Sequence, residues 1–134
     1  MTGTTLASVR LVTDDVDRLT AFYELVTGVP ADRLTPDFAE LRTAAGTLAV
    51  GHTRTVALFA PGSADPAANR TAIVEFRVDD VDDAAARLAD TAVETVAPPT
   101  TMPWGNRSLL LRDPDGTLVN LFTPVSAEAL ARFA

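Results

Sequence analysis

The chain has 134 residues, a formal net charge of −7 and no cysteine. This length fits a single domain, and the lack of cysteine excludes disulfides, thiolate catalysis and cysteine-bound zinc. The acidic balance argues against a nucleic-acid-binding surface, which needs a concentrated basic face, and suits a cationic or neutral ligand. No signal peptide and no membrane-spanning apolar run is visible, so we expect a cytoplasmic protein that binds neither nucleic acid nor membrane.

The first predicted elements are a strand and a helix. Residues 5–13 alternate with branched apolar side chains, which predicts a strand. Asp15 and its acidic neighbours then provide a helix N-cap and first-turn acids. Apolar residues recur at helical spacing from Val16 to Val26, and Gly28 followed by Pro30 ends the helix.

Three short strands are predicted next, over residues 38–43, 47–51 and 55–59, which gives the order β-α-β-β-β. The single histidine, His52, falls in a predicted turn between two of these strands. We interpret it as a solvated turn residue rather than a general base, because a base requires a partner and a pocket.

The second half begins after an exposed linker at residues 62–70; the stretch 61–69 carries two prolines, a glycine and small polar residues. The elements expected after it are a strand over 71–78, a helix capped by Asp79 and Asp80 that runs to Ala92, and strands over 93–97, 107–112 and 118–122. Asp113 to Gly116 predicts a hairpin turn, and Ser126 caps a final short helix within 127–134.

Two repeated motifs show that the second half of the sequence is similar to the first. V-R-L-V-T-D-D-V-D at 9–17 returns 65 residues later as V-E-F-R-V-D-D-V-D, and V-A-L-F-A-P at 56–61 returns 63 residues later as V-N-L-F-T-P. A duplication of this size indicates two paired units. We therefore predict an α+β fold with one domain, residues 1–126, in which two β-α-β-β-β modules (5–61 and 71–124) form a curved mixed sheet with helices on its outer face.

The tandem modules, the D-D-V-D that opens each helix, P-W-G-N-R at 103–107 and D-P-D-G at 113–116 resemble the vicinal oxygen chelate superfamily. That superfamily includes glyoxalase I, extradiol dioxygenases, fosfomycin-inactivating enzymes and bleomycin-resistance proteins. The resemblance covers residues 6–124 and implies the glyoxalase/bleomycin-resistance fold. It implies no single activity, because this fold serves metal enzymes and metal-free binders alike.

In metal-binding members of that superfamily, ligands lie on the first and last strand of each module. The repeat assigns those positions here to Ser8, Ala57, Ile73 and Asn120. A divalent transition metal needs several imidazole or carboxylate donors. None of the four residues supplies one, so we predict no metal and no cofactor.

Strand alternation selects further residues for a predicted cleft. Arg10 shares a face with Ser8, and Glu75 shares one with Ile73. Since Arg10 and Glu75 occupy matching positions of the repeat, we expect them either to form an ion pair in the cleft or to contact a ligand.

Aromatic residues are the other candidates. Phe59 and Phe122 share the face of the closing-strand positions, and Phe38 lies on an adjacent predicted strand; each either fills the core or lines the cleft. Trp104 and Asn106 lie in the loop P-W-G-N, where the indole is either a ligand wall or a structural plug. In the bleomycin-resistance proteins that this chain resembles, an aromatic cleft commonly lies at a dimer interface, which implies a homodimer.

The leading functional prediction is a metal-free protein of the antibiotic-resistance type that sequesters an aromatic natural product or antibiotic without turnover. The alternative is a metal-independent isomerase or lyase in which Arg10, Glu75 or Asn120 performs acid–base and oxyanion roles. The predicted ligand-binding residues are Ser8, Arg10, Phe38, Phe59, Ile73, Glu75, Trp104, Asn106, Asn120 and Phe122.

Overall fold

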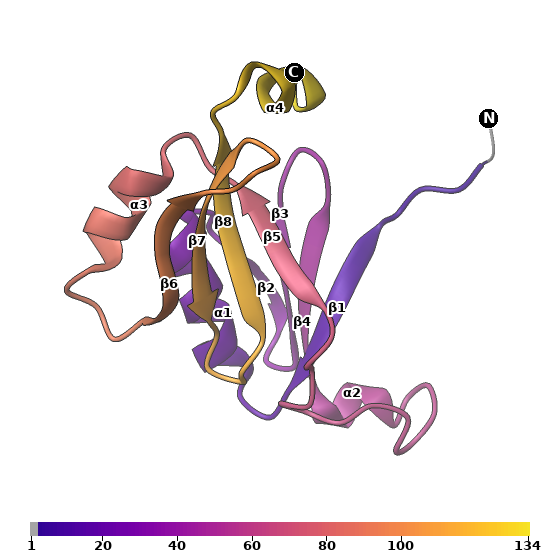
Figure 1. The fold of residues 1–134 in the computed structure, drawn as a ribbon. Coiled ribbons are helices and arrows are strands. Elements are labelled where there is room, and N and C mark those ends of the chain that lie inside the picture. Colours follow the sequence, from indigo (N-terminus) through magenta and orange to yellow (C-terminus); the bar gives the residue numbers. More distant parts are fainter. Residues whose placement is uncertain (1–2) are drawn as a thin grey trace. The chain divides into compact units, whose positions relative to one another are not determined.

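A computed structural model describes residues 3–134, and the chain divides into two compact units, Met1–Ala68 and Asn69–Ala134 (Figure 1). The division falls within the predicted linker, residues 62–70. Each unit contains one β-α-β-β-β module and one four-stranded mixed sheet. The predicted α+β fold of tandem modules is therefore confirmed.

The first unit has its strands in the order β1-β4-β3-β2, with β1 parallel to β4 and the other pairs antiparallel. Its elements are β1 (Ser8–Thr13), α1 (Val16–Thr27), β2 (Asp32–Thr35), β3 (Phe38–Arg42), β4 (Thr47–His52) and the short helix α2 (Thr53–Val56).

Helix α1 begins and ends where the sequence predicts. The Asp15 carboxylate accepts a hydrogen bond from the Arg18 N–H at 3.0 Å. Gly28 ends the helix in the left-handed region at φ 73° and donates its N–H to the Glu24 carbonyl at 2.9 Å. The helix packs against β3 and β4, and the buried apolar side chains of this core are Leu19, Tyr23, Val26, Ala39, Leu41, Leu48 and Val50.

The second unit repeats this topology in the order β5-β8-β7-β6. Its elements are β5 (Ile73–Arg77), α3 (Val81–Leu88), β6 (Glu94–Thr101), β7 (Asn106–Arg112), β8 (Leu118–Pro124) and α4 (Ala127–Arg132). Asp80 caps α3 by accepting from two backbone N–H groups, and Ser126 caps α4. The hairpin turn also forms as predicted, because the Gly116 N–H donates to the Asp113 carbonyl at 3.0 Å.

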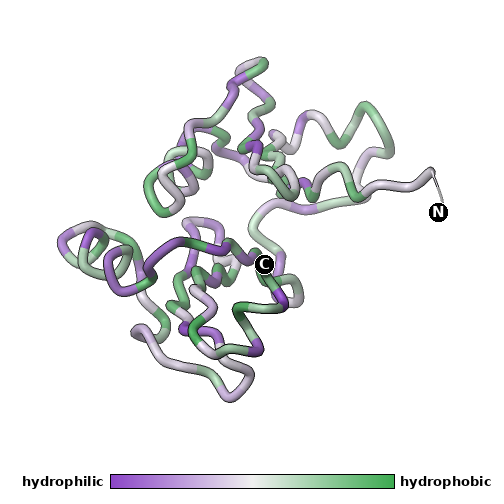
Figure 2. Tube along the Cα trace, turned by 90° about the horizontal axis from the view of Figure 1, so that it is seen from above, coloured by the Kyte–Doolittle hydropathy of each residue, from purple (hydrophilic) through white to green (hydrophobic). Residues whose placement is uncertain are grey.

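Hydrophilic and hydrophobic residues are interspersed along the chain in both units (Figure 2), and buried and less buried positions alternate in strands such as β3 and β5. This pattern leaves one face of each sheet for its helix and gives the other a mixed composition. In the second unit α3 contacts β6, β7 and β8 (Figure 1), over a core that includes Val81, Leu88, Leu109, Leu111 and Leu121. Within residues 3–134, no helix has the length and apolar character that a membrane crossing requires.

One strand prediction for the first unit is wrong, and one strand was missed. Residues 55–59 do not form a strand; α2 and a following turn occupy that region, with the Ala60 N–H donating to the Val56 carbonyl at 3.0 Å. The strand that completes the module is β2, which sequence reasoning missed. Its four residues are all exposed, so this edge strand lacks the apolar alternation that signals a strand.

Candidate functional site

The most distinctive cluster of the first unit consists of Arg10, Phe38 and Phe59, here called the Arg10 cluster. The Arg10 guanidinium carbon lies 5.1 Å from the ring centroid of Phe38 and 5.2 Å from that of Phe59. Both distances are within the range of cation–π attraction. Phe59 is 74% exposed, so one side of the cluster is available to another planar group.

Strand register places the Arg10 cluster on the face of the sheet opposite α1. Arg10 pairs with Ala49 on β4, and Phe38 pairs with Gly51. Directly paired residues share a face, and the neighbours Leu48 and Val50 point toward α1 and are buried. We call the opposite side the Arg10 face. Among the described residues 3–68, the turn that follows α2 reaches this face and brings Phe59 to Arg10.

An ion pair joins the segment before Phe38 to the helix before Phe59. The Asp37 carboxylate pairs with the Arg54 guanidinium, which joins the start of β3 to α2. This hydrogen bond lowers the pKa of Asp37 and raises that of Arg54. Phe38 follows Asp37 directly and is the first residue of β3, so the pair ties the start of the strand that carries one ring to the helix that precedes the other.

The positive charge of Arg10 is not compensated within its own unit. Glu40 lies on the same face, but its carboxylate accepts from the Arg42 guanidinium at 2.9 Å. Within residues 3–68, no hydrogen bond or ion pair to the Arg10 guanidinium is present. The arrangement therefore offers a cation held between rings, which can attract an acceptor or an anionic group on a planar ligand.

His52 has a structural role in this region. It is the last residue of β4, not a turn residue, and its Nδ1 accepts the Arg54 N–H at 3.0 Å. The Thr55 hydroxyl donates to the His52 carbonyl at 2.7 Å. These contacts start α2 and turn the chain back toward Arg10, which is how Phe59 reaches the cluster.

The register also corrects one of the assigned metal-ligand positions. Glu75 pairs with Asn120 on β8, and Arg10, its repeat counterpart, pairs with Ala49 on β4. The counterpart of Asn120 is therefore Ala49, whereas Ala57 follows α2 and belongs to no strand. The misleading signal was the resemblance of V-A-L-F to V-N-L-F.

The corrected set of four positions is Ser8, Ala49, Ile73 and Asn120. A hydroxyl, a methyl group, a butyl group and an amide do not match the imidazole and carboxylate donors that divalent transition metals take. In the described part of the chain, residues 3–134, no group of three or more His, Cys, Asp or Glu side chains is arranged to hold a metal ion. The donor chemistry at these positions does not fit the metal centre of the superfamily's enzymes.

On the second sheet, Glu75, Asn120 and Ile73 share the face opposite α3, here called the Glu75 face. Glu75 Oε2 accepts a hydrogen bond from Asn120 Nδ2 at 2.8 Å, and Asn120 Oδ1 is buried without a hydrogen-bond partner. Ile73 is 51% exposed. Arg10 and Glu75 lie in different units, and their predicted ion pair remains a prediction.

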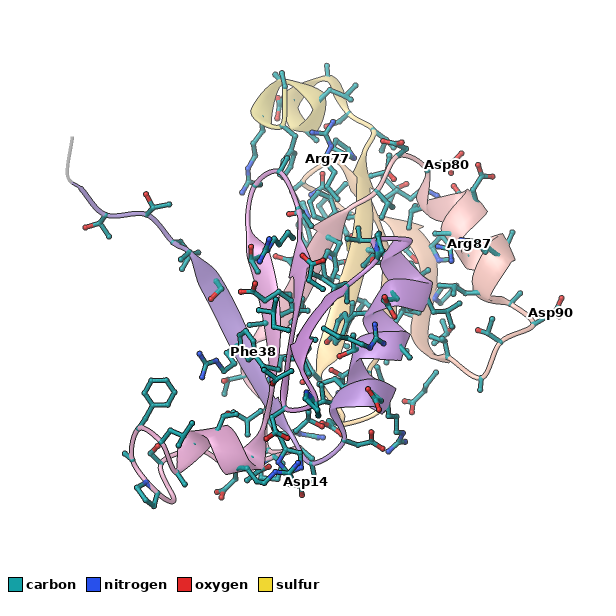
Figure 3. All side chains as sticks on the ribbon, turned by 180° about the vertical axis from the view of Figure 1, so that it is seen from behind. Asp14, Phe38, Arg77, Asp80, Arg87 and Asp90 are labelled. Carbon is teal, nitrogen blue, oxygen red and sulfur yellow. The ribbon has the colours of Figure 1, made fainter. Side chains whose placement is uncertain are left out.

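Phe122 lies on the Glu75 face, but the C-terminal end of the chain covers it. Its ring centroid lies 5.2 Å from that of Phe133, and it is only 7% exposed. Arg77 points toward α4 (Figure 3) and donates to the Phe133 carbonyl at 2.6 Å. In this structure Phe122 therefore has a packing role, and only displacement of Phe133 would bring it to a ligand.

Trp104 and Asn106 differ sharply in exposure. Trp104 is 62% exposed in the turn that links β6 to β7, so packing does not explain its position. Asn106 is buried, and its Oδ1 has no hydrogen-bond partner. Its carbonyl accepts the Met102 N–H at 2.7 Å, which closes the turn beneath the indole.

Comparison with known proteins places this geometry in a family. A sequence model of the Glyoxalase/Bleomycin resistance protein/Dioxygenase superfamily matches residues 5–121. No curated protein matches the sequence significantly.

Solved structures share the fold at low sequence identity. A glyoxalase/bleomycin resistance protein/dioxygenase from Nocardioides is 23% identical with a TM-score of 0.74, covering 95% of this chain and 87% of that chain. A family enzyme from Burkholderia phytofirmans PsJN is 19% identical with a TM-score of 0.79, covering 91% and 100%. TioX from Micromonospora sp. ML1 is 26% identical with a TM-score of 0.68, also covering 91% and 100%. The chain therefore belongs to the Glyoxalase/Bleomycin resistance protein/Dioxygenase superfamily.

Proposed function

We propose that this protein is a metal-free binding protein of the bleomycin-resistance type, which sequesters an aromatic natural product or antibiotic without turnover. The observation that carries the proposal is the Arg10 cluster, in which an uncompensated guanidinium lies between two phenylalanine rings and the ring of Phe59 is 74% exposed. A planar ligand stacks on the exposed ring and presents an acceptor group to the cation.

The local charge sets the preferred ligand more strongly than the net charge of −7. A contact pair interacts across a few ångströms, whereas exposed charges beyond about 10 Å are largely screened at ordinary salt. We therefore favour an aromatic ligand that carries carbonyl or phenolate oxygens where it meets Arg10. A positive group elsewhere on the same molecule is compatible with the acidic surface.

The test is a titration with a panel of planar and polycyclic antibiotics, followed by calorimetry and by mass spectrometry of the recovered compound. Phe59→Ala should weaken binding by roughly 1 to 3 kcal/mol, the loss expected of an aromatic contact. Leu58→Ala is the matched control, because Leu58 is 84% exposed and lies outside the cluster. Equal affinities of these two variants for every bound compound would refute the proposed site.

The alternative, a metal-independent isomerase or lyase, is favoured by one observation. The Asn120 amide orients the Glu75 carboxylate through a hydrogen bond of 2.8 Å, as a general base requires. Chemical change in the recovered compound, lost in Glu75→Gln while binding persists, would establish this function in place of sequestration.

We also propose that the protein is a homodimer in solution. The support is the resemblance to bleomycin-resistance proteins and the number of large apolar side chains on the surface, among which Leu58, Phe59 and Trp104 are more than 60% exposed. Light scattering at micromolar concentration tests the proposal, and a monomeric mass would contradict it.

A further inference from the structure

A pocket of about 280 Å³ opens in the second unit where the chain enters β5. Segment 69–72 lines it together with Ile73, Arg112 and Leu118. Ligand pockets are commonly in the range of roughly 300 to 1,000 Å³, so this one suits a small molecule.

The side chain of Asn69 holds the wall of the pocket in place. Its Oδ1 accepts the Ala72 N–H at 3.0 Å and the Thr71 N–H at 3.3 Å. Its Nδ2 donates to the Ala72 carbonyl at 3.0 Å and to the Thr117 hydroxyl at 3.2 Å. One amide therefore ties segment 69–72 to the start of β8 and fixes the backbone that carries Arg70.

Two arginines, Arg70 and Arg112, are among the residues that line the pocket. Arg112 donates to the Gly116 carbonyl at 3.0 Å, while its Nε lies 3.9 Å from the Glu94 carboxylate, beyond hydrogen-bond distance. Within residues 69–134, Arg70 has no ion-pair or hydrogen-bond partner for its side chain. The Arg70 charge is therefore available to an anionic group.

The floor of the pocket is apolar. Ile73 and Leu118 are register partners on β5 and β8, so their side chains lie next to each other on the Glu75 face. Ile73 is 51% exposed, which leaves apolar surface available to a ligand. Guanidinium groups bind carboxylate and phosphate oxygens through paired N–H donors.

We propose that this pocket binds a small organic oxyanion, in which a carboxylate or phosphate meets Arg70 and Arg112 and an adjoining apolar group lies on Ile73 and Leu118. The proposal does not rest on the proposed function. It uses none of the residues of the Arg10 cluster, and all of its residues belong to the second unit.

The experiment titrates the full-length protein with benzoate, phenyl phosphate, inorganic phosphate and the uncharged control benzamide, and follows the backbone amide resonances of residues 69–73. Benzoate or phenyl phosphate should shift these resonances saturably, and whichever binds more tightly identifies the anionic group. Arg70→Gln should weaken that binding by roughly tenfold to a hundredfold, as expected for a charge-assisted hydrogen bond. Arg18→Gln, on α1 of the first unit, should leave it unchanged.

Arg112→Gln should weaken binding similarly, but this variant also loses the hydrogen bond to Gly116. Arg70→Gln keeps the test decisive if Arg112→Gln unfolds. The proposal is overturned if benzamide binds as tightly as benzoate, if neither organic anion shifts these resonances, or if Arg70→Gln binds with wild-type affinity. Inorganic phosphate that binds as tightly as phenyl phosphate would overturn the role of the apolar floor. A Phe59→Ala variant that keeps this binding separates the result from the fate of the Arg10 cluster.

Discussion

A methyl group added to Gly51 would lie 3.2 Å from the Cδ of Arg10. The Arg10 side chain therefore lies across β4 at the point where that strand has no side chain. The bare backbone at Gly51 is part of what places the guanidinium between the rings of Phe38 and Phe59.

Gly51→Ala should displace Arg10 from the rings at a cost in stability of about 0.5 to 3 kcal/mol, because the methyl group meets the exposed Arg10 side chain and also, at 3.2 Å, the half-buried Thr55 hydroxyl. Ring-current effects make the Arg10 Nε–Hε resonance a direct reporter of this displacement. Gly46→Ala is the control, since a methyl group there meets nothing within 4 Å. An unchanged Arg10 resonance in Gly51→Ala would contradict the prediction.

Trp104→Ala should leave the free energy of unfolding within about 0.5 kcal/mol of wild type, as for other surface substitutions, because the indole is 62% exposed. A buried aromatic plug would instead cost about 3 to 5 kcal/mol. Urea denaturation measures the difference. If Trp104 also contacts the ligand, binding quenches its fluorescence, and as the single tryptophan of the chain it needs no deconvolution. Val125→Ala serves as the control for fold and affinity, because Val125 is 47% exposed and its N–H donates to the carbonyl of Gly105, the residue after Trp104, at 2.8 Å.

The ion pair between Glu24 and Arg33 should make stability depend on pH in the acidic range. The Arg33 guanidinium, at 3.0 Å, and the Ala31 N–H lower the pKa of Glu24 from its ordinary value of 4.5. A lowered carboxyl pKa means that the folded protein binds the proton less tightly than the unfolded chain. The contribution is therefore complete above about pH 4.5 and is lost as the pH falls through the lower folded value.

Glu24→Gln should remove this pH dependence while keeping an oxygen for the Ala31 N–H. Because the Arg33 side chain is 40% exposed, solvent screening limits the loss at neutral pH to less than about 1 kcal/mol. Urea denaturation at several pH values between neutral pH and pH 3 measures how the free energy of unfolding of each variant depends on pH. In a double-mutant cycle, adding Arg33→Gln should cost little more; equal and additive losses would show that the two groups do not interact.

Gly105→Ala should destabilise the attachment of α4. Gly105 has φ 93°, and a methyl group on it would lie 1.9 Å from Ser126 Oγ and 3.1 Å from Ala129 Cβ. Gly116 is a matched control, because it has the same φ and nothing within 4 Å. Gly116→Ala should cost about 1 to 3 kcal/mol for backbone strain, and Gly105→Ala should cost more. Equal melting temperatures would show that α4 does not need this close approach.

The sequence predicts most of the fold because its strongest signals are local. The motif that repeats after 65 residues aligns β1 with β5 and the acidic cap of α1 with that of α3. The turn at 113–116 follows from the chemistry of its residues. The prediction of a closing strand at 55–59 was wrong because the apolar pattern of V-A-L-F resembles that of a strand. In the structure only Val56 is buried there, whereas Leu58 and Phe59 are exposed, and a short apolar run does not distinguish a strand from a turn of helix.

The candidate site was predictable as a set of residues but not as an arrangement. Arg10, Phe38 and Phe59 were each selected, yet their convergence depends on the turn that follows α2. Phe122 was selected by the same alternation, but Phe133 covers it. Sequence pattern shows that α4 exists and where it begins, whereas its docking position depends on the close approach at Gly105.

The alternation along β4 has a consequence for how such a protein can change. Leu48 and Val50 are buried toward α1, while Ala49 and Gly51 lie under Arg10 on the other face. A substitution at 49 or 51 therefore acts first on the surface beneath the guanidinium and not on the side chains packed against α1. Selection for a new ligand can proceed through these two small residues, within the limit that Ala49 is 1% exposed and a methyl group at 51 meets Thr55 Oγ1 at 3.2 Å.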